Sequence, residues 1–218
     1  MYDTHPVRAI LEHAARGRFP PPDGSISVLA APPGRSDAVI AFTAHHVIAA
    51  DVDPDDVLAR LPSRDLGAPV NAEFLAWLGR RLGSPPGSLD VVLAAPGLPD
   101  ARDHTLLRDA GRRTHKRVDR AERYREEVSV YSDSEETAVV VLGRGLAGRR
   151  ELALEIEEAM RGRGHGRRLL LAARSLIPAK EYVFAQVAPG NVASLRAFLA
   201  AGFAPICAEV LFLKGRSG

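Results

Sequence analysis

The chain has 218 residues, of which 46% are hydrophobic and 26% are charged, so neither a disordered nor a fibrous class is indicated. Its 29 basic and 27 acidic residues leave a net charge of +2, which gives no global field for binding nucleic acid or an anionic membrane. No signal peptide is apparent at the N-terminus, and the longest apolar run, residues 38–50, is too short to span a bilayer. The single cysteine cannot form an internal disulfide. These features predict a cytoplasmic protein without nucleic-acid or membrane partners.

The first quarter of the chain reads as two strands and a short helix. Strands are expected at residues 26–30 and 38–47, between loops rich in proline and glycine. Asp53 has the properties of an N-cap, and Pro54 follows it at the first helical position, which predicts a helix over residues 54–61.

A second helix and a buried strand follow. Asn71 caps this helix, whose apolar residues recur at helical spacing until Gly83 ends it. Residues 89–94 read as a buried strand, and we place a domain boundary near residue 110. The basic stretch 112–125 has a helical spacing of apolar residues, and its interspersed acids favour a solvated helix surface over a nucleic-acid patch.

The rest of the chain continues the alternation of strands and helices. Turn-forming residues between two apolar runs predict a hairpin, and proline or glycine ends each later helix. The expected elements are the hairpin of 128–132 and 137–142, strands at 151–156, 182–187 and 205–213, and helices at 166–177 and 191–201.

Two adjacent histidines, His45 and His46, lie in an apolar strand ahead of several aspartates. Histidine titrates near neutrality and could serve as a base. On one strand only one of the two can face inward, and a partly buried structural histidine is the favoured interpretation. No second set of ligands with metal spacing accompanies them, so we predict no metal site.

The segment 161–166 reads RGRGHG and lies between the predicted strand at 151–156 and the helix that begins near Gly166. This position brings backbone N–H groups and the positive end of a helix dipole to one spot, where an anion binds. Glycines let phosphate oxygens approach the main chain, because they have no Cβ. The alternative is a glycine-rich surface turn. Charge for phosphates is available from Arg161, Arg163, Arg167 and Arg168.

A competing motif is Gly143-x-Gly145-x-x-Gly148, which matches the dinucleotide-binding fingerprint of a Rossmann-type oxidoreductase. That fingerprint requires a helix directly after it and an acidic residue about 20 positions on, at the end of a second strand. The chain instead has arginines and glycines there, so this alternative is the weaker one.

The two downstream motifs together resemble those of the GNAT acyltransferase superfamily. Its pyrophosphate signature, Arg/Gln-x-x-Gly-x-Gly/Ala, is met by Arg161, Gly164 and Gly166. The segment QVAPGNVASLRAFLAAGF, residues 186–203, is similar to the family's strand, Asn-x-x-Ser/Ala motif and helix ending in Gly-Phe. The resemblance covers residues 128–213.

The resemblance implies a mixed α/β sheet flanked by helices, with residues 111–218 as an acyl-CoA-binding core. Residues 1–110 would form an additional N-terminal α/β segment that shapes the acceptor pocket. Two parallel strands, 151–156 and 182–187, would splay apart to admit the pantetheine arm of acetyl-CoA. The implied cofactor contacts are the backbone of Leu154 and Ile156, then Arg161, Gly162, Arg163, Gly164, His165 and Gly166, and lastly Asn191 and Ser194.

The resemblance also implies an N-acetyltransferase in which an amine attacks the thioester directly. Glu151 and Glu155 are an even number of residues apart on the cofactor strand and so on one face, and either could drain the amine's proton through water. The family's usual general acid, a tyrosine, is replaced here by Phe198. Other groups that could serve are Tyr182, Tyr131 and Cys207.

The Phe198 substitution leaves a CoA-binding module with little or no catalysis as the alternative function. The acceptor, a small-molecule amine or a protein amine, has no motif in the sequence. Residues 209–214 read as an edge strand that a second subunit could cover in a homodimer.

Overall fold

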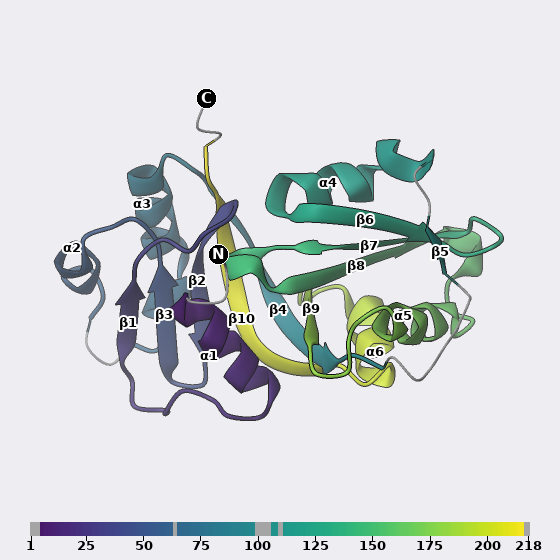
Figure 1. Ribbon diagram of the computed structural model, residues 1–218. Coiled ribbons are helices and arrows are strands. Elements are labelled where there is room, and N and C mark those ends of the chain that lie inside the picture. The colour runs from purple at the N-terminus through teal and green to yellow at the C-terminus, as the bar shows by residue number, and fades with distance from the viewer. Residues whose placement is uncertain (1–4, 63–64, 99–105, 109–110, 216–218) are drawn as a thin grey trace. The chain divides into compact units, whose positions relative to one another are not determined.

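The computed structural model describes residues 5–62, 65–98, 106–108 and 111–215. The fold is mixed α/β (Figure 1), as predicted. The chain divides into two compact units: unit 1 contains residues 1–91, 146–148 and 206–218, and unit 2 contains residues 92–145 and 149–205. This division differs from the predicted boundary near residue 110, because the chain enters unit 2 in mid-strand and its last strand returns to unit 1.

Unit 1 contains a mixed sheet whose order is β1, β3, β2, β10 and then the first part of β4. β1 pairs with β3 in parallel, whereas β3 with β2 and β2 with β10 are antiparallel. The bounds are β1 (Ile26–Leu29), β2 (Ser36–Phe42), β3 (His45–Ala49), β4 (Pro86–Pro96) and β10 (Ala204–Leu213).

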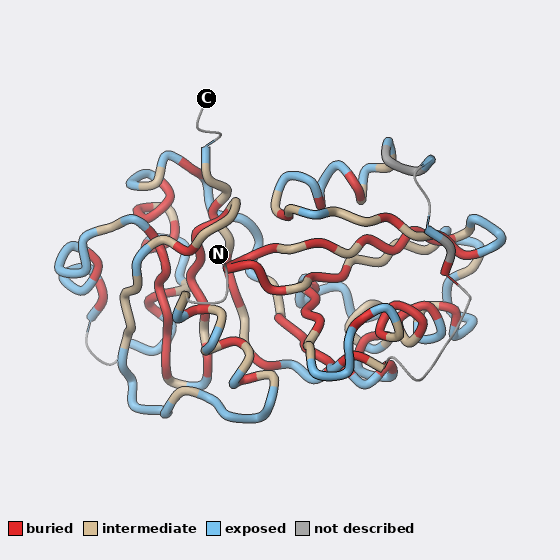
Figure 2. Tube along the Cα trace, in the orientation of Figure 1, coloured by how far each residue is buried: buried red, intermediate tan, exposed pale blue. Residues whose placement is uncertain are grey.

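The core of unit 1 lies between this sheet and helices α2 (Pro54–Leu58) and α3 (Ala72–Leu82). β2 and β3 are buried almost throughout (Figure 2), which explains their nearly continuous apolar sequence. Phe74 and Leu78 of α3 pack with strand residues such as Phe212. A short 3-10 helix, η1 (Ala68–Val70), precedes α3.

Helix α3 has the caps that the sequence predicts. The Asn71 side chain accepts a hydrogen bond from the Phe74 N–H at 2.8 Å, and Gly83 ends the helix in the left-handed region at φ 63°. Asp53 likewise accepts from the Asp55 N–H at 2.9 Å and begins α2.

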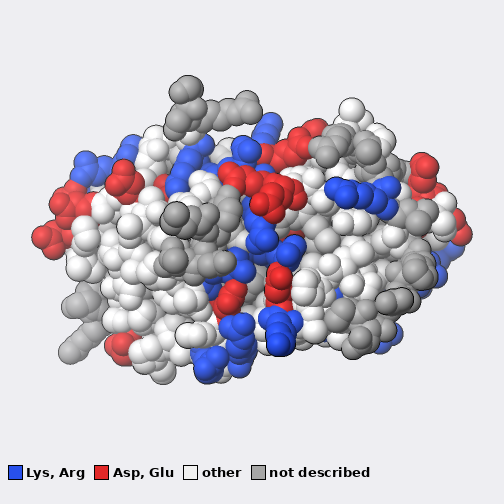
Figure 3. All heavy atoms as spheres, in the orientation of Figure 1, with Lys and Arg blue, Asp and Glu red and all other residues white. Residues whose placement is uncertain are grey.

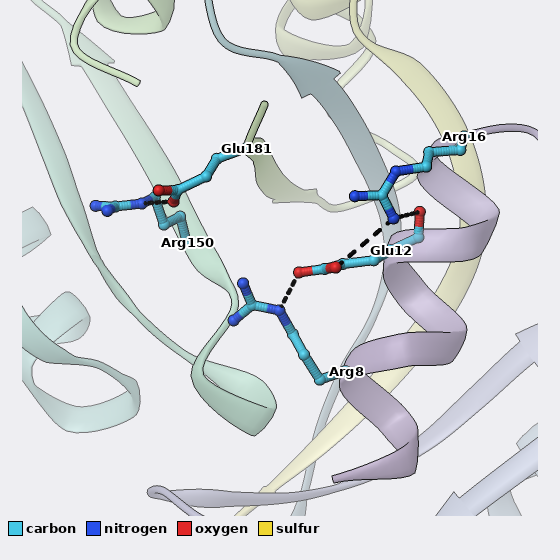
Figure 4. A network of polar contacts seen from close by, with 5 residues as sticks. All are labelled: Arg8, Glu12, Arg16, Arg150 and Glu181. Carbon is cyan, nitrogen blue, oxygen red and sulfur yellow. Dashed lines mark hydrogen bonds and ion pairs between the residues drawn. The ribbon is translucent and has the colours of Figure 1, made fainter. Parts of the chain in front are cut away.

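Helix α1 (Pro6–Ala15), which the sequence analysis did not predict, begins at the His5 cap with proline in its first turn. Glu12 pairs with Arg8 at 2.5 Å and with Arg16 at 3.6 Å (Figure 4), so successive turns of the helix are linked by i,i+4 ion pairs.

Two predictions for unit 1 were wrong. The strand expected at 38–47 is two antiparallel strands, because the chain turns at residues 43–44, where Ala44 has φ 51°. The segment 209–214 is not an edge strand: β10 lies between β2 and β4 in the strand order, and its residues 208–213 pair with residues 36–41 of β2.

Unit 2 continues the strand order from the end of β4 through β9, β8, β7 and β6 to β5. β5 with β6, β6 with β7 and β7 with β8 are antiparallel, and β8 with β9 is parallel. The bounds are β5 (Leu107–Arg108), β6 (Glu126–Ser132), β7 (Ala138–Arg144), β8 (Arg150–Ile156) and β9 (Tyr182–Val187).

Helices cover both faces of the unit 2 sheet (Figure 1). The apolar stripe of helix α4, which includes Val118, packs on strand residues such as Val141 of β7. Lys116, Arg120 and Arg123 are exposed, as predicted, whereas Arg125 at the end of the predicted basic stretch is buried. Helices α5 and α6 lie together on the opposite face. The bounds are α4 (Lys116–Tyr124), α5 (His165–Ser175), α6 (Val192–Ala200), η2 (Gly111–Thr114), η3 (Leu146–Gly148, which clusters with unit 1) and η4 (Glu158–Met160).

Basic and acidic side chains lie next to one another on the face drawn in Figure 3. In unit 2, for example, Arg150 pairs with Glu181 (Figure 4) and Arg144 with Glu127 at 2.8 Å. Of the helices in the described ranges, none is long and apolar enough to cross a membrane.

Candidate functional site

The parallel strands β8 and β9 form a fork in unit 2. They pair at two positions, Arg150 with Val183 and Glu151 with Phe184. β8 then runs on to Ile156 and remains paired with β7 along its whole length, while β9 runs on to Val187. The closed end of the fork is therefore at Glu151, and the open end is at Ile156. Beyond Glu151, peptide groups along the facing edges are left for other partners.

The predicted anion-binding turn follows the open end of the fork. Gly162 and Gly164 both have φ 76°, in the left-handed region that favours glycine, and a Cβ on either would meet open space. Gly164 is the N-cap of α5, which begins at His165. The first N–H groups of a helix have no carbonyl partner within it, so this turn presents donors where the helix dipole is positive.

Helix α6 reaches the same turn. The Asn191 side chain caps α6 by accepting from the Ser194 N–H at 3.2 Å, as predicted. A Cβ on Gly166 would lie 3.6 Å from Ala197 and 3.3 Å from Ile156, so the absence of a side chain there lets α5 pack closely against α6 and β8. The structure thus brings the two sequence motifs together.

Two arginines of the turn region are anchored to main-chain carbonyls. Arg161 Nε donates to the Ile156 carbonyl at 3.0 Å, and Arg167 Nε donates to the Ala200 carbonyl at 2.9 Å. Both side chains are exposed, as is Arg163. Main-chain carbonyls therefore hold the guanidinium groups of Arg161 and Arg167.

His165 differs from its neighbours in the turn because its ring is buried. Its Nε2 lies 3.0 Å from Asp133 Oδ2, and its Nδ1 lies 2.9 Å from Arg168 Nη2. Arginine can only donate, so Nδ1 is the acceptor and the ring proton is on Nε2, from which it is donated to Asp133. Only the peptide group of His165 is then available to a ligand of the turn.

Asp133 connects the β6–β7 hairpin to the start of α5. It also accepts from Thr137 Oγ1 at 2.6 Å and from the Ala138 N–H at 3.0 Å. Burial would raise the pKa of this carboxyl, but the hydrogen bonds from Thr137, His165 and Ala138 outweigh burial and lower the pKa.

Glu151 is fully buried at the closed end of the fork, between two arginines. Arg149 Nε donates to one carboxylate oxygen and Arg125 Nε to the other, both at 2.8 Å. Burial alone would raise the pKa of Glu151, but the charges of Arg149 and then Arg125 outweigh it, together with hydrogen bonds from Gln186 and Arg149. They lower the pKa to about 2. These contacts give Glu151 a structural role.

Glu155 lies on the same face of β8 and is half-exposed. Arg117 of α4 donates to it from Nε at 3.1 Å, with about a third of each side chain accessible to solvent. Of the two glutamates suggested by the sequence, Glu155 is the one that water reaches.

Phe198, which replaces the family's tyrosine, and the three groups considered as general acids belong to different elements. Phe198 is a core residue, with its ring 4.9 Å from that of Phe203 in an edge-to-face contact. Tyr182 directly precedes Val183, the residue of β9 that pairs with Arg150. Tyr131 lies on β6, two strands from β8. Cys207 belongs to unit 1.

The glycine fingerprint at residues 143–148 is not a dinucleotide site. Its last three residues form η3, and the chain then returns as β8, antiparallel to β7, where the fingerprint requires a helix and a parallel strand. Gly145 has a different reason to be glycine, because a Cβ there would overlap the Glu151 carboxylate.

His45 and His46 are both buried, which corrects the prediction that only one faces inward. His45 Nδ1 lies 3.1 Å from Asp23 Oδ1 and 3.0 Å from Ser25 Oγ. Burial, and then the neighbouring His45, lower the pKa of His46. These contacts agree with the interpretation of the histidines as structural residues.

The sequence analysis missed Arg125, Arg149, Gln186 and Asp133 as members of the site. Arg125 is 26 residues from Glu151 and 61 from Gln186, so no local spacing connects them. Only the doublet Arg149-Arg150, directly before the strand predicted at 151–156, was a visible signal.

No protein-family model and no curated protein matches the chain. Similar solved structures include a GNAT-family acetyltransferase from Colwellia psychrerythraea, at 12% identity and a TM-score of 0.40, covering 66% of this chain and 63% of that one. Another is a GCN5-related N-acetyltransferase from Kribbella flavida, at 15% identity and a TM-score of 0.39, covering 65% of this chain and 64% of that one. The match thus spans less than two thirds of either protein. Both of these solved structures are acetyltransferases of the GNAT (GCN5-related) family.

Proposed function

We propose that the chain is an N-acyltransferase that takes its acyl group from acetyl-CoA. The observation that carries the proposal is the fork of β8 and β9, which opens at Ile156 toward the glycine turn at the start of α5. An anion-binding turn beside two separated parallel strands suits a ligand with phosphates at one end and an amide-containing arm at the other.

The donor's fit follows from the residues of unit 2. Its phosphates would lie over Gly162 and Gly164, where there is open space, with the exposed Arg163 beside them. Its arm would run from the turn into the fork, along Ile156 and Leu154 toward Glu151. That stretch of strand is roughly 16 Å long at about 3.3 Å per residue. Asn191 and Ser194 would flank the arm from α6.

The reacting end of the donor then lies near the closed end of the fork. The acceptor amine forms a C–N bond with the thioester carbonyl carbon as the C–S bond breaks. The nitrogen loses one proton and the departing thiolate takes up one proton, so the charge balances. We assign the removal of that proton to Glu155, because Glu151 is held by two arginines. Glu155 lies four residues along β8 from Glu151, about 13 Å, so the proton would reach it through a chain of waters. Tyr182 is the candidate to return a proton to sulfur.

Isothermal titration with acetyl-CoA tests donor binding. Gly164→Val forces a β-branched residue to φ 76° in the turn, and we expect it to weaken binding at least tenfold. The matched control is Gly17→Val, at φ 77° and also facing open space, but in unit 1. No binding by the wild-type chain, or equal binding by both variants, would contradict the proposal.

A CoA-binding module without efficient catalysis is the second candidate, favoured by the placement of Phe198 in the core. Thiol release separates the two functions. If acetyl-CoA binds but no amine in a broad panel accelerates release above the uncatalysed rate, the binding module is the correct function.

A further inference from the structure

Arg125 extends from the end of α4 to the fork, where it contacts both strands. Its Nε donates to Glu151 of β8 at 2.8 Å, and its Nη2 donates to Gln186 Oε1 of β9 at 3.1 Å. Gln186 lies two residues beyond Phe184, the last paired residue of β9. The guanidinium group is therefore at the point where the strands separate.

The third nitrogen of this guanidinium, Nη1, is buried and has no hydrogen-bond partner. The side chain as a whole is 9% exposed. A buried donor without an acceptor costs about 1–3 kcal/mol, and more when it carries charge, so such groups are rare unless a ligand or water completes them. Glu151 accepts from Arg125 with only one of its carboxylate oxygens, because the other oxygen accepts from Arg149.

Nη1 lies at the end of the fork where the acceptor would react, and not at the end where the donor's phosphates would bind. The phosphate-binding turn follows the open end of the fork, whereas Arg125 contacts Glu151 at the closed end. Arg125 approaches from the α4 face of the sheet, the face that also carries Glu155. Gln186, beside the guanidinium, is half-exposed, so solvent reaches this face of β9.

We propose that Arg125 recognises a carboxylate on the acceptor, and that the acceptor is an amine carrying a carboxylate close to its nitrogen, as an amino acid does. This inference rests on the proposed acyl transfer. A guanidinium N–H forms its strongest hydrogen bonds with carboxylates, particularly where water is excluded. The Nη1 donor is the group available to make that bond, while Nε and Nη2 hold the guanidinium in place.

The test compares pairs of acceptors that differ only in this group: amino acids and the corresponding amino-acid amides. Wild-type kcat/KM for thiol release from acetyl-CoA is expected to favour the carboxylate on the order of 10- to 100-fold, the worth of one charged hydrogen bond. Arg125→Lys keeps a positive charge beside Glu151 but removes the guanidinium N–H groups, and should bring that ratio close to one. Arg120→Lys on the same helix, whose guanidinium lies over Tyr124, is the control.

The outcomes separate this inference from the proposed function. The inference is overturned if Arg125→Lys loses rate equally with carboxylate and amide acceptors. It is also overturned if the wild-type enzyme accepts only amines that have no carboxylate. Titration of each variant with acetyl-CoA verifies that the donor site has folded. Absence of acetyl-CoA binding in the wild-type chain would instead overturn the proposed function, and the inference with it.

Discussion

At the scale of single residues, the pair of buried arginines on Glu151 gives the clearest stability prediction. Glu151→Gln leaves two buried guanidinium groups without their shared carboxylate. Removing one partner of a buried charge network costs about 3–5 kcal/mol, so the free energy of unfolding in urea should fall by that amount. Glu155→Gln, at a half-exposed pair, is the control and should cost about 0–1 kcal/mol. Equal losses would contradict the structural role of Glu151.

The same carboxylate makes stability depend on pH. The pKa of Glu151 is about 2 in the folded chain, against an ordinary value of 4.5. The folded state therefore binds fewer protons than the unfolded state between these values, and the stabilisation is complete above pH 4.5 and is lost as the pH falls toward 2. That shift corresponds to roughly 3 kcal/mol. Glu151→Gln should flatten this part of the stability curve.

Gly145 tests the packing around the carboxylate. A Cβ there would overlap the carboxylate of Glu151, so Gly145→Ala should displace the buried network and cost about 1–3 kcal/mol. Gly190→Ala is the matched control, because a Cβ at Gly190 meets nothing within 4 Å. Thermal unfolding of the two variants measures the difference, and similar melting temperatures would show that the network tolerates the extra carbon.

At the scale of elements, Asp133 fixes the start of α5 through His165. Asp133→Asn replaces one carboxylate oxygen with an NH2 group, which can only donate and so, in place of Oδ2, accepts from neither Thr137 nor His165. We expect faster amide hydrogen exchange in residues 165–168 and in the β6–β7 hairpin, with β3 unchanged as an internal reference. Unaltered protection of these amides would mean that packing alone holds the helix start.

The elements that the sequence predicts well are those with local signals at both ends. Asn71 and Gly83 define α3 because each acts within its own turn of chain. The turn between β2 and β3 has no such signal: Ala44 adopts φ 51° inside an apolar run, where the strand pairing determines the conformation. The glycine turn and the Asn191 cap were predictable for the same local reason.

At the scale of the whole molecule, the limits of prediction are those of long-range pairing. β10 was taken for an edge strand because sequence gives no information on its partner, β2, about 170 positions away. The different roles of Glu151 and Glu155 have the same origin. Glu155 pairs with Arg117 of α4 and Glu151 pairs with Arg125 at the end of α4, and both arginines are far away in the sequence. Residue chemistry identified the candidates, and only the fold separates their roles.

The division of the chain into units makes a final prediction about fragments. Residues 111–218 alone would lack the end of β4, which neighbours β9, and would carry β10 without β2. We therefore expect this fragment to show no cooperative thermal transition by circular dichroism, because two strands would be left with unpaired edges. Co-expression with residues 1–110 should restore the transition, since both missing strands are then supplied. A cooperative transition in the isolated 111–218 fragment would mean that this part of the chain folds independently of β2 and β4.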